Sequence, residues 1–465
     1  MQTLSRQSRE HADIRALYHD LQHAPQQHLA EARQLLRNHL QQTAAHLAEL
    51  PNNPAHLEAH ILRNNARTAS AYRDYLLSRK QGQPRRYFSN RAHALYFLRN
   101  VAATKLVDGA WLYGVLGDWH DPRRHDLVRT YLEELGDGEP DQNHVLMYKQ
   151  LLANQDIQHL ESLPTDRFIQ GTLQLALGHL ASEFLPEVIG YNLGYEQLPL
   201  HLMITTYELA ELGIDPHYFR LHITIDNASS GHAHRAARAV LDNLPGNEQQ
   251  TFYHRVRQGF QLNALGSSST DVINAFNLDK ELYRVLEDKA RAARHMHSDF
   301  CRIDGRTINE WLDTNGRIPA LLDALQRHGW VHRHQDPSGS RFWRLIQGNR
   351  APMFGVFSAY ELQLLHDWIA GEWQCKQTSR LAGRRSPSGN GLDPLVAASH
   401  KEQEVKLQKK LHAMPEQQRT QHLIELMAPA RHFTPEGLAA TRLFSRQIRQ
   451  PPDSAQFSVS RINTR

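Results

Sequence analysis

The chain has 465 residues, of which 40% are hydrophobic and 22% charged, and its formal net charge is +4 at pH 7. These values are ordinary for a globular protein of two or three domains. No apolar run is long enough to cross a bilayer, and no dense basic stripe is present, so we expect neither membrane nor nucleic-acid partners. Two cysteines and a polar N-terminus without an apolar signal segment indicate a cytoplasmic protein.

Helical periodicity runs through most of the first 300 residues, interrupted by clusters of proline, glycine and asparagine. No alternation of strands and helices is visible, which predicts an all-α fold. Pro186 is expected in mid-helix, where it would kink the chain. The predicted helical segments are 11–49 (one long helix or a hairpin of helices), 55–80, 90–118, 127–136, 140–153, two within 165–212, then 215–243 and 247–300 with a break at 266–269.

The character of the sequence changes after residue 300. Two short helices are followed by an apparent β-hairpin with its turn at residues 337–339, which suggests a small winged-helix-like unit. Residues 376–400 resemble a linker, and a helix at 401–428 precedes a polar tail. Large apolar residues after position 310 should form a core that docks on the main bundle: Trp311, Trp330, Trp343, Phe354, Phe357 and Trp368. The expected domains are 1–88 (N-terminal extension), 89–300 (metal-binding bundle), 301–375 (small domain) and 376–465 (linker and tail).

The stretch at 215–240 combines a strongly apolar helix with ionisable residues. Its sequence is DPHYFRLHITIDNASSGHAHRAARAV. His222 and Asp226 are four residues apart and therefore share one face of the helix. Ionisable groups in a buried helix must be paired or bound to a metal, so a His–Asp pair without metal remains open at this point.

Further carboxylates and imidazoles occupy positions where the helical pattern calls for apolar residues. Hard oxygens and imidazoles projecting into a bundle suit two non-haem iron or manganese ions. A mononuclear site of two histidines and one carboxylate is a subset of the same residues, and a zinc–cysteine site is excluded by composition. The candidate ligands are Asp108, Glu134, His144, Glu187, His222, Asp226 and His232.

The order of these residues resembles that of the haem-oxygenase-like diiron oxidases and oxygenases, a family of iron-containing redox enzymes. The resemblance covers residues 90–243 and implies a haem-oxygenase-like bundle without haem. Asp108 stands where the family's first metal-binding helix has a glutamate. Glu134 and His144 match the Glu and His of its second. Glu187, in FLPEVIGYNLGYE, matches the glutamate of the next core helix.

The last core helix of the family carries the pattern His-x-x-x-Asp-x-x-His. His222 and Asp226 match its first two positions, but Ser229 occupies the third. His232 comes three residues later, so it needs a bulge or break near residues 229–231 to reach the metal. His234 is the alternative last ligand.

The resemblance implies two ferrous ions per chain and an O2-dependent oxidation. The expected partners are O2 and a small amino-acid- or fatty-acid-like substrate, which would undergo N-oxygenation, C–H oxidation or C–C cleavage; a homodimer stays open. Two alternatives remain. One is a metal-free enzyme of the same fold that binds an organic substrate. The other is a non-catalytic regulator built on residues 301–349, although the candidate recognition helix there has only Arg317 and Arg327.

Overall fold

The fold is taken from a computed structural model of the chain. It describes residues 14–449 apart from 44–48, 159, 226–230, 294, 298, 314–315, 349, 354 and 374–393. Helices make up nearly all of the regular structure in this part of the chain, which confirms the all-α prediction. The one sheet found there is a hairpin of two short antiparallel strands.

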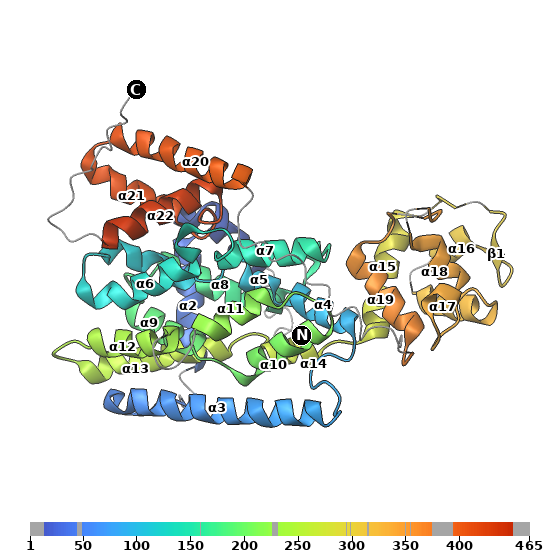
Figure 1. Ribbon diagram of the computed structural model, residues 1–465, viewed down its shortest axis with the longest axis horizontal. Helices are drawn as coiled ribbons and strands as arrows, with labels where there is room; N and C mark the ends of the chain where they lie inside the picture. The colour runs from blue at the N-terminus through green and yellow to red at the C-terminus, as the bar shows by residue number, and fades with distance from the viewer. Residues whose placement is uncertain are drawn as a thin grey trace.

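Of the N-terminal segments, the long helix α3 (Leu57–Lys80) lies along one edge of the bundle, whereas α2 (Leu29–Thr43) crosses its middle beside α8 (Ile169–His179) (Figure 1). Residues 11–49, expected as one long helix or a hairpin of helices, form two helices divided at Pro25, and the long helix expected at 55–80 forms almost as predicted. The elements are a helix at residues 14–23, η1 (Pro25–Gln27), α2 (Leu29–Thr43), η2 (Pro54–His56) and α3 (Leu57–Lys80).

The central bundle is built from short helices joined by tight turns. Its first half comprises α4 (Arg91–Asn100), α5 (Ala102–Lys105), η3 (Ala110–Asp118), η4 (Pro122–Arg124), α6 (His125–Glu134), η5 (Gly136–Gly138), α7 (His144–Asn154), η6 (Leu160–Ser162) and η7 (Thr165–Phe168). Its second half comprises α8 (Ile169–His179), α9 (Leu185–Tyr195), α10 (Leu200–Glu211), α11 (His217–Ile225), α12 (His232–Asp242), α13 (Gln249–Gln261), η8 (Leu262–Ala264) and α14 (Ser269–Asn274).

Three expectations about these helices are wrong. The segment 90–118 is not continuous, because a turn at 106–109 separates α5 from η3. Residues 165–212 form three α-helices rather than two. Pro186 lies in the first turn of α9 and not in mid-helix, so it begins the helix, where its missing N–H costs nothing.

Glycines allow α9 and α13 to pack at very close range. A Cβ on Gly190 would lie 1.8 Å from the carbonyl oxygen of Val256, and one on Gly259 would lie 2.1 Å from that of Glu187. Neither position has room for a side chain. This contact fixes one face of α9 against α13 and turns the opposite face toward the interior of the bundle.

A second lobe extends from one end of the bundle (Figure 1). The expected hairpin around 337–339 is wrong: this segment forms a 3-10 turn followed by a helix, and the hairpin lies earlier, at 302–307. The described residues therefore lack the hairpin that the winged-helix-like prediction placed after the two short helices. The elements are α15 (Leu278–Ala292), β1 (Arg302–Ile303), β2 (Arg306–Thr307), α16 (Ile308–Leu312), α17 (Ile318–Arg327), η9 (Pro337–Gly339), α18 (Arg341–Ile346) and α19 (Ala359–Ala370).

The lobe is joined to the bundle by a shared hydrophobic cluster and by buried polar contacts. The Asp367 carboxylate accepts a hydrogen bond from the backbone N–H of Ala92 at the start of α4 (2.8 Å), and buried Glu281 of α15 lies 3.9 Å from the guanidinium of Arg99 in α4. Trp311 and Trp368 pack in the same cluster as Leu98 of α4. Phe354, also expected in this core, lies outside the described residues.

Three further helices cover the bundle beside α6 and α7 (Figure 1). They are α20 (Pro394–His412), α21 (Glu416–Leu426) and α22 (Pro435–Arg449), where a single helix and a tail were expected. We call α20–α22 the C-terminal unit. The linker predicted before it falls largely outside the described residues. No helix in the described part of the chain has the length and apolar character that a bilayer span requires.

Candidate metal centre

Asp108 lies in the turn between α5 and η3 and is almost completely buried. The next residue, Gly109, has a φ of 81°, and a Cβ there would lie 2.8 Å from the Cβ of Glu134. A glycine is therefore required both by the backbone conformation and by the approach of Glu134. The turn aims the Asp108 carboxylate into the bundle, where a continuous helix had been expected.

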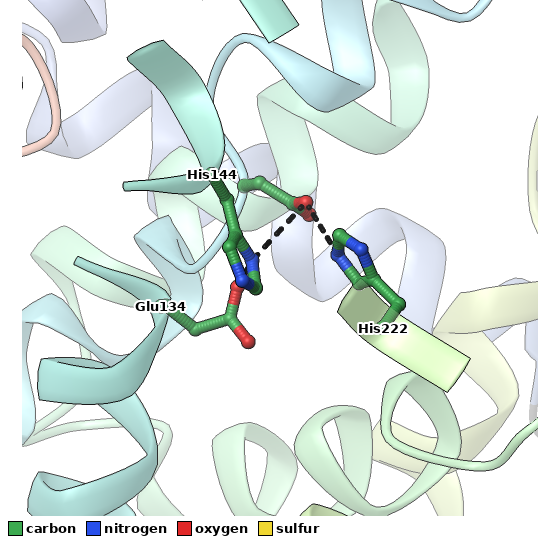
Figure 2. A group of neighbouring side chains, drawn as sticks. Glu134, His144 and His222 are labelled. Carbon is green, nitrogen blue, oxygen red and sulfur yellow. Dashed lines mark hydrogen bonds and ion pairs between the residues drawn. The ribbon is translucent and has the colours of Figure 1, made fainter. Parts of the chain in front are cut away.

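Glu134 and His144 meet because the chain reverses direction between α6 and α7. Glu134 is the last residue of α6 and His144 the first of α7. Glu134 Oε2 and His144 Nδ1 are 2.6 Å apart, and both side chains are buried. His144 Nδ1 is also 4.0 Å from Asp108 Oδ2. Figure 2 shows the side chains of Glu134, His144 and His222 converging from three elements.

His222 reaches the same group from α11. Its Nδ1–H donates to the carbonyl of Tyr218 (2.8 Å), which leaves Nε2 facing Asp108 Oδ2 at 3.3 Å. The ring centroids of His222 and His144 are 4.3 Å apart. Ligand atoms of Asp108, Glu134, His144 and His222 all lie within 4.8 Å of one another, close enough to hold one metal ion.

A second group adjoins the first through Glu134. It consists of Glu134, Glu196 and His232, whose ligand atoms also lie within 4.8 Å of one another. His232 Nδ1 is 3.0 Å from Glu196 Oε2 and 3.5 Å from Glu134 Oε1. His232 Nε2 is 2.7 Å from Glu133 Oε2, so that carboxylate fixes the orientation of the ring. The predicted break before His232 agrees with Gly231, which precedes α12 as its N-cap.

Two buried polar atoms in these groups, Glu196 Oε1 and His144 Nε2, lack a hydrogen-bond partner among the described residues. Glu134 Oε2 and His144 Nδ1 contact each other as an ion pair at 2.6 Å. Glu208 provides an internal comparison, because this fully buried carboxylate accepts hydrogen bonds from Tyr75 and from backbone N–H groups at 86–88. Buried polar groups are normally satisfied in this way. Unpartnered oxygens and nitrogens within groups of this kind fit a bound cation.

The excess of carboxylates governs the protonation of the histidines. Burial alone would lower the pKa of His232, but Glu196 and Glu133 outweigh it and raise that pKa to about 11. Burial likewise opposes a charge on His144, yet Glu134 and Asp108 raise its pKa. Without a metal, protons therefore neutralise the centre, and a metal cation would take over that role.

Asp108 stays ionised although burial favours its neutral form. Lys105 and then His222 lower its pKa. The hydroxyls of Tyr195 and Tyr218 donate hydrogen bonds to its two oxygens, and Lys105 Nζ lies 3.7 Å from Oδ1. Burial and then Asp108 raise the pKa of both tyrosines well above 10, so they remain neutral donors.

Glu187 does not join either group, which corrects the expectation that it would converge with the others. Its two carboxylate oxygens accept hydrogen bonds from Arg255 of α13 at 2.6 and 2.7 Å. Asp226 lies outside the described residues. His234, the alternative last ligand, is in α12 but belongs to neither group.

Glu196 is the residue that sequence reasoning missed. Glu187 and Glu196 are nine positions apart, which places them on opposite sides of a helix. Gly190 and Gly194 share the Glu187 face and pack on α13. This stripe of small residues marks the face that contacts a neighbouring helix, and it could have indicated that the opposite face, with Glu196, turns inward.

A cavity of about 290 Å³ opens beside the first group. Tyr195, Tyr218 and His222 form part of its wall next to the candidate ligands, while Phe97, Val101, Leu202 and Phe219 are among its apolar lining residues. Lys105, Arg167 and His201 also line it. Burial, followed by the charge of Lys105, lowers the pKa of His201 to about 4, so His201 is neutral.

Comparison with known protein families decides what kind of helical bundle this is. Residues 95–264 match the model of a family described as iron-containing redox enzymes. This segment belongs to the iron-containing redox enzyme family. The resemblance inferred from the sequence is thus confirmed, together with a haem-oxygenase-like fold for these residues. No curated protein and no solved structure matches the chain.

All six residues of the two candidate groups lie within the segment that belongs to the iron-containing redox enzyme family. The buried carboxylates and imidazoles fit the metal from which that family takes its name. The second lobe and the C-terminal unit lie outside the matched segment.

Proposed function

We propose that the chain is a non-haem iron enzyme that binds two ferrous ions and uses O2 to oxidise a small organic substrate. Asp108, Glu134, His144 and His222 would hold one iron, and Glu134, Glu196 and His232 would hold the other. The single observation that carries this proposal is the shared position of Glu134. Its Oε2 lies next to His144 and its Oε1 next to His232, as expected for a carboxylate between two cations.

Ferrous iron held by carboxylates and imidazoles supplies the electrons that reduce O2. The protein's own part is to hold the ligands and exclude water. Tyr195 and Tyr218 orient the Asp108 carboxylate, and Glu133 orients His232. The tyrosines Tyr131, Tyr148 and Tyr191 are fully buried in the surrounding bundle, so bulk water has little access from those sides.

The cavity beside His222 fits a small substrate with an apolar body and an anionic group. Its apolar wall includes Phe97, Val101 and Phe219, which would hold a hydrocarbon portion out of water. Lys105 and Arg167 would attract a carboxylate. The side chain of Arg167 is only 8% exposed; its Nη1 lies 3.4 Å from Asp166 Oδ2, and its Nε has no hydrogen-bond partner among the described residues. An amino-acid- or fatty-acid-like molecule has both features.

The proposal is tested by loading the protein with ferrous iron under argon and then measuring O2 uptake with a panel of amino acids and medium-chain fatty acids. We expect iron-dependent O2 consumption that rises with at least one member of the panel. The Glu134→Gln variant, which keeps the shape of the side chain but removes its charge, should bind little iron and consume no O2.

The result separates the alternatives that the sequence left open. A folded wild-type protein that binds no iron under argon would contradict the proposal and favour a metal-free enzyme of the same fold. Saturation at one iron per chain would favour a mononuclear site. Unchanged iron binding by Glu134→Gln would refute the shared-carboxylate arrangement.

A further inference from the structure

A buried amide, that of Asn143, connects the two ligand-bearing ends of α6 and α7 across the loop between them. Asn143 has no exposed surface. Its side-chain oxygen caps α7 by accepting a hydrogen bond from the N–H of Leu146 (3.0 Å). Its Nδ2 donates to the carbonyl of Leu135, directly after Glu134, at 3.2 Å. Asn143 therefore connects the end of the helix that carries Glu134 with the start of the helix that carries His144.

The remaining hydrogen of this amide points out of the bundle into the C-terminal unit. Asn143 Nδ2 lies 3.1 Å from Nδ1 of His432, which is 1% exposed and belongs to the turn between α21 and α22. An amide nitrogen can only donate, so Nδ1 of His432 is the acceptor and is unprotonated. The side-chain amide of Asn143 thus caps α7, donates to the carbonyl of Leu135 after α6 and donates to His432 at the same time.

The same loop is clamped by the C-terminal unit at several other points. Gly138 has a φ of 88°, and a Cβ there would lie 2.4 Å from the carbonyl oxygen of Leu438 in α22. Arg442 donates to the carbonyl of Gly138 (2.5 Å), and Ser445 donates to the carboxylate of Asp137 (2.9 Å). Tyr131 in α6 donates to the carbonyl of Met427 (2.6 Å).

We infer that the C-terminal unit is a working part of the metal centre, with His432 as a positioning residue that acts through Asn143 on Glu134 and His144. The inference rests on the proposed function. It extends the site beyond the segment that matches the family, because α20–α22 begin 130 residues after its last matched position, at 394 against 264. Loss of the His432 acceptor leaves a buried amide hydrogen unpaired and frees the loop that sets the spacing of the two ligands.

The test compares iron affinity in full-length variants. His432→Ala removes the acceptor, whereas His432→Gln offers a side-chain oxygen that can accept from Asn143. Changes around metal ligands cost about 10- to 100-fold in affinity. Titration with ferrous iron under argon against a competing chelator should show at least tenfold weaker binding by His432→Ala and a substantial recovery by His432→Gln.

The matched control is His93→Ala. His93 is likewise a buried histidine with one hydrogen bond to a distant segment, the carbonyl of Ile273 (2.8 Å), but it lies in α4 and not in the α6–α7 loop. Its loss should lower the thermal midpoint and leave iron affinity unchanged. A His432→Ala protein that is folded and binds iron as tightly as the wild type would overturn the inference. A wild type that binds no iron would instead overturn the proposed function.

Hydrogen exchange on the wild-type chain keeps the inference testable if His432→Ala fails to fold. Coupling between two sites is reciprocal, so iron must stabilise the docked C-terminal unit if that unit stabilises the iron site. Ferrous iron should slow exchange in residues 135–146 and also in 427–434, while α17 in the second lobe stays unchanged. Protection confined to 135–146 would overturn the inference.

Discussion

At the scale of single residues, the two glutamates of α9 offer the clearest distinction between a ligand and a structural carboxylate. Glu187 is paired with Arg255, whereas Glu196 faces His232 and has an oxygen without a partner among the described residues. Both are buried, so burial alone could not separate them. What separates them is which face of α9 packs on α13.

We predict that Glu196→Gln loses about half of the bound iron or more, while Glu187→Gln keeps the iron of the wild type. Removal of the Glu187 charge breaks only its pair with Arg255, which is 38% exposed, so the stability cost should stay near 1 kcal/mol. Metal analysis after dialysis under argon measures the first effect and urea unfolding the second. Equal iron loss in both variants would show that Glu196 does not lie on the face of α9 that turns toward the metal centre.

A second residue-scale prediction concerns the buried neutral histidine of α4. Burial lowers the pKa of His93 to about 4 against an ordinary value of 6.5. Between these values the unfolded chain binds a proton that the folded chain does not, so this group's contribution to stability is full above pH 6.5 and falls as the pH drops. The slope is roughly 1 kcal/mol per pH unit.

The measurement is urea unfolding of wild type and His93→Gln at pH 7 and pH 5. The wild type should lose more stability between these two pH values than the variant does, by about 1–2 kcal/mol. An identical pH dependence in the two proteins would mean that His93 is not held neutral by burial.

At the scale of elements, part of the architecture was predictable from sequence and part was not. The helix end after Glu134 follows from Gly136, and the break before His232 follows from Gly231, because these are local signals. The helix of His144 was predicted from residue 140 but begins four residues later, where Asn143 caps it. The turn that carries Asp108 interrupts an apolar run without proline, so periodicity predicted a continuous helix. The choice between Glu187 and Glu196 depends on packing against α13, for which Gly190 and Gly194 on the Glu187 face are the one signal in the sequence.

The close contact of α9 and α13 yields a prediction for Gly190→Ala. The added methyl would meet the carbonyl of Val256, so the helices must separate, at a cost of about 1–3 kcal/mol. Because Glu196 lies on the opposite side of α9, iron affinity should fall as well. Gly117→Ala is the matched control, since a Cβ there has nothing within 4 Å. Thermal unfolding and iron titration that do not distinguish the two variants would contradict this packing.

At the scale of the whole molecule, the chain behaves as one assembly built around the bundle. Buried contacts at Asp367 and Glu281 join the second lobe to α4, and the C-terminal unit closes the α6–α7 loop. The lobe begins before residue 301, because α15 packs with α17 and α19. From the sequence, the domain boundary was instead expected between residues 300 and 301, where the character of the sequence changes.

A chain ended at residue 300 should therefore aggregate or lose stability. The cut removes α19 and exposes the apolar faces of α4 and α15, including Leu282 and Val285, which are almost fully buried in the intact chain. Size-exclusion chromatography and thermal unfolding would reveal this loss. A truncated protein that stays monodisperse and unfolds at the wild-type temperature would contradict docking of the lobe.

The central claim is that the two adjoining groups hold two irons with Glu134 between them. The most direct measurement is anomalous scattering at the iron edge from crystals loaded with ferrous iron under argon. We expect two anomalous peaks. One should lie among Asp108, Glu134, His144 and His222, and the other among Glu134, Glu196 and His232. A fully loaded crystal with a single peak in these two groups, or with iron bound only elsewhere in the chain, would contradict this claim.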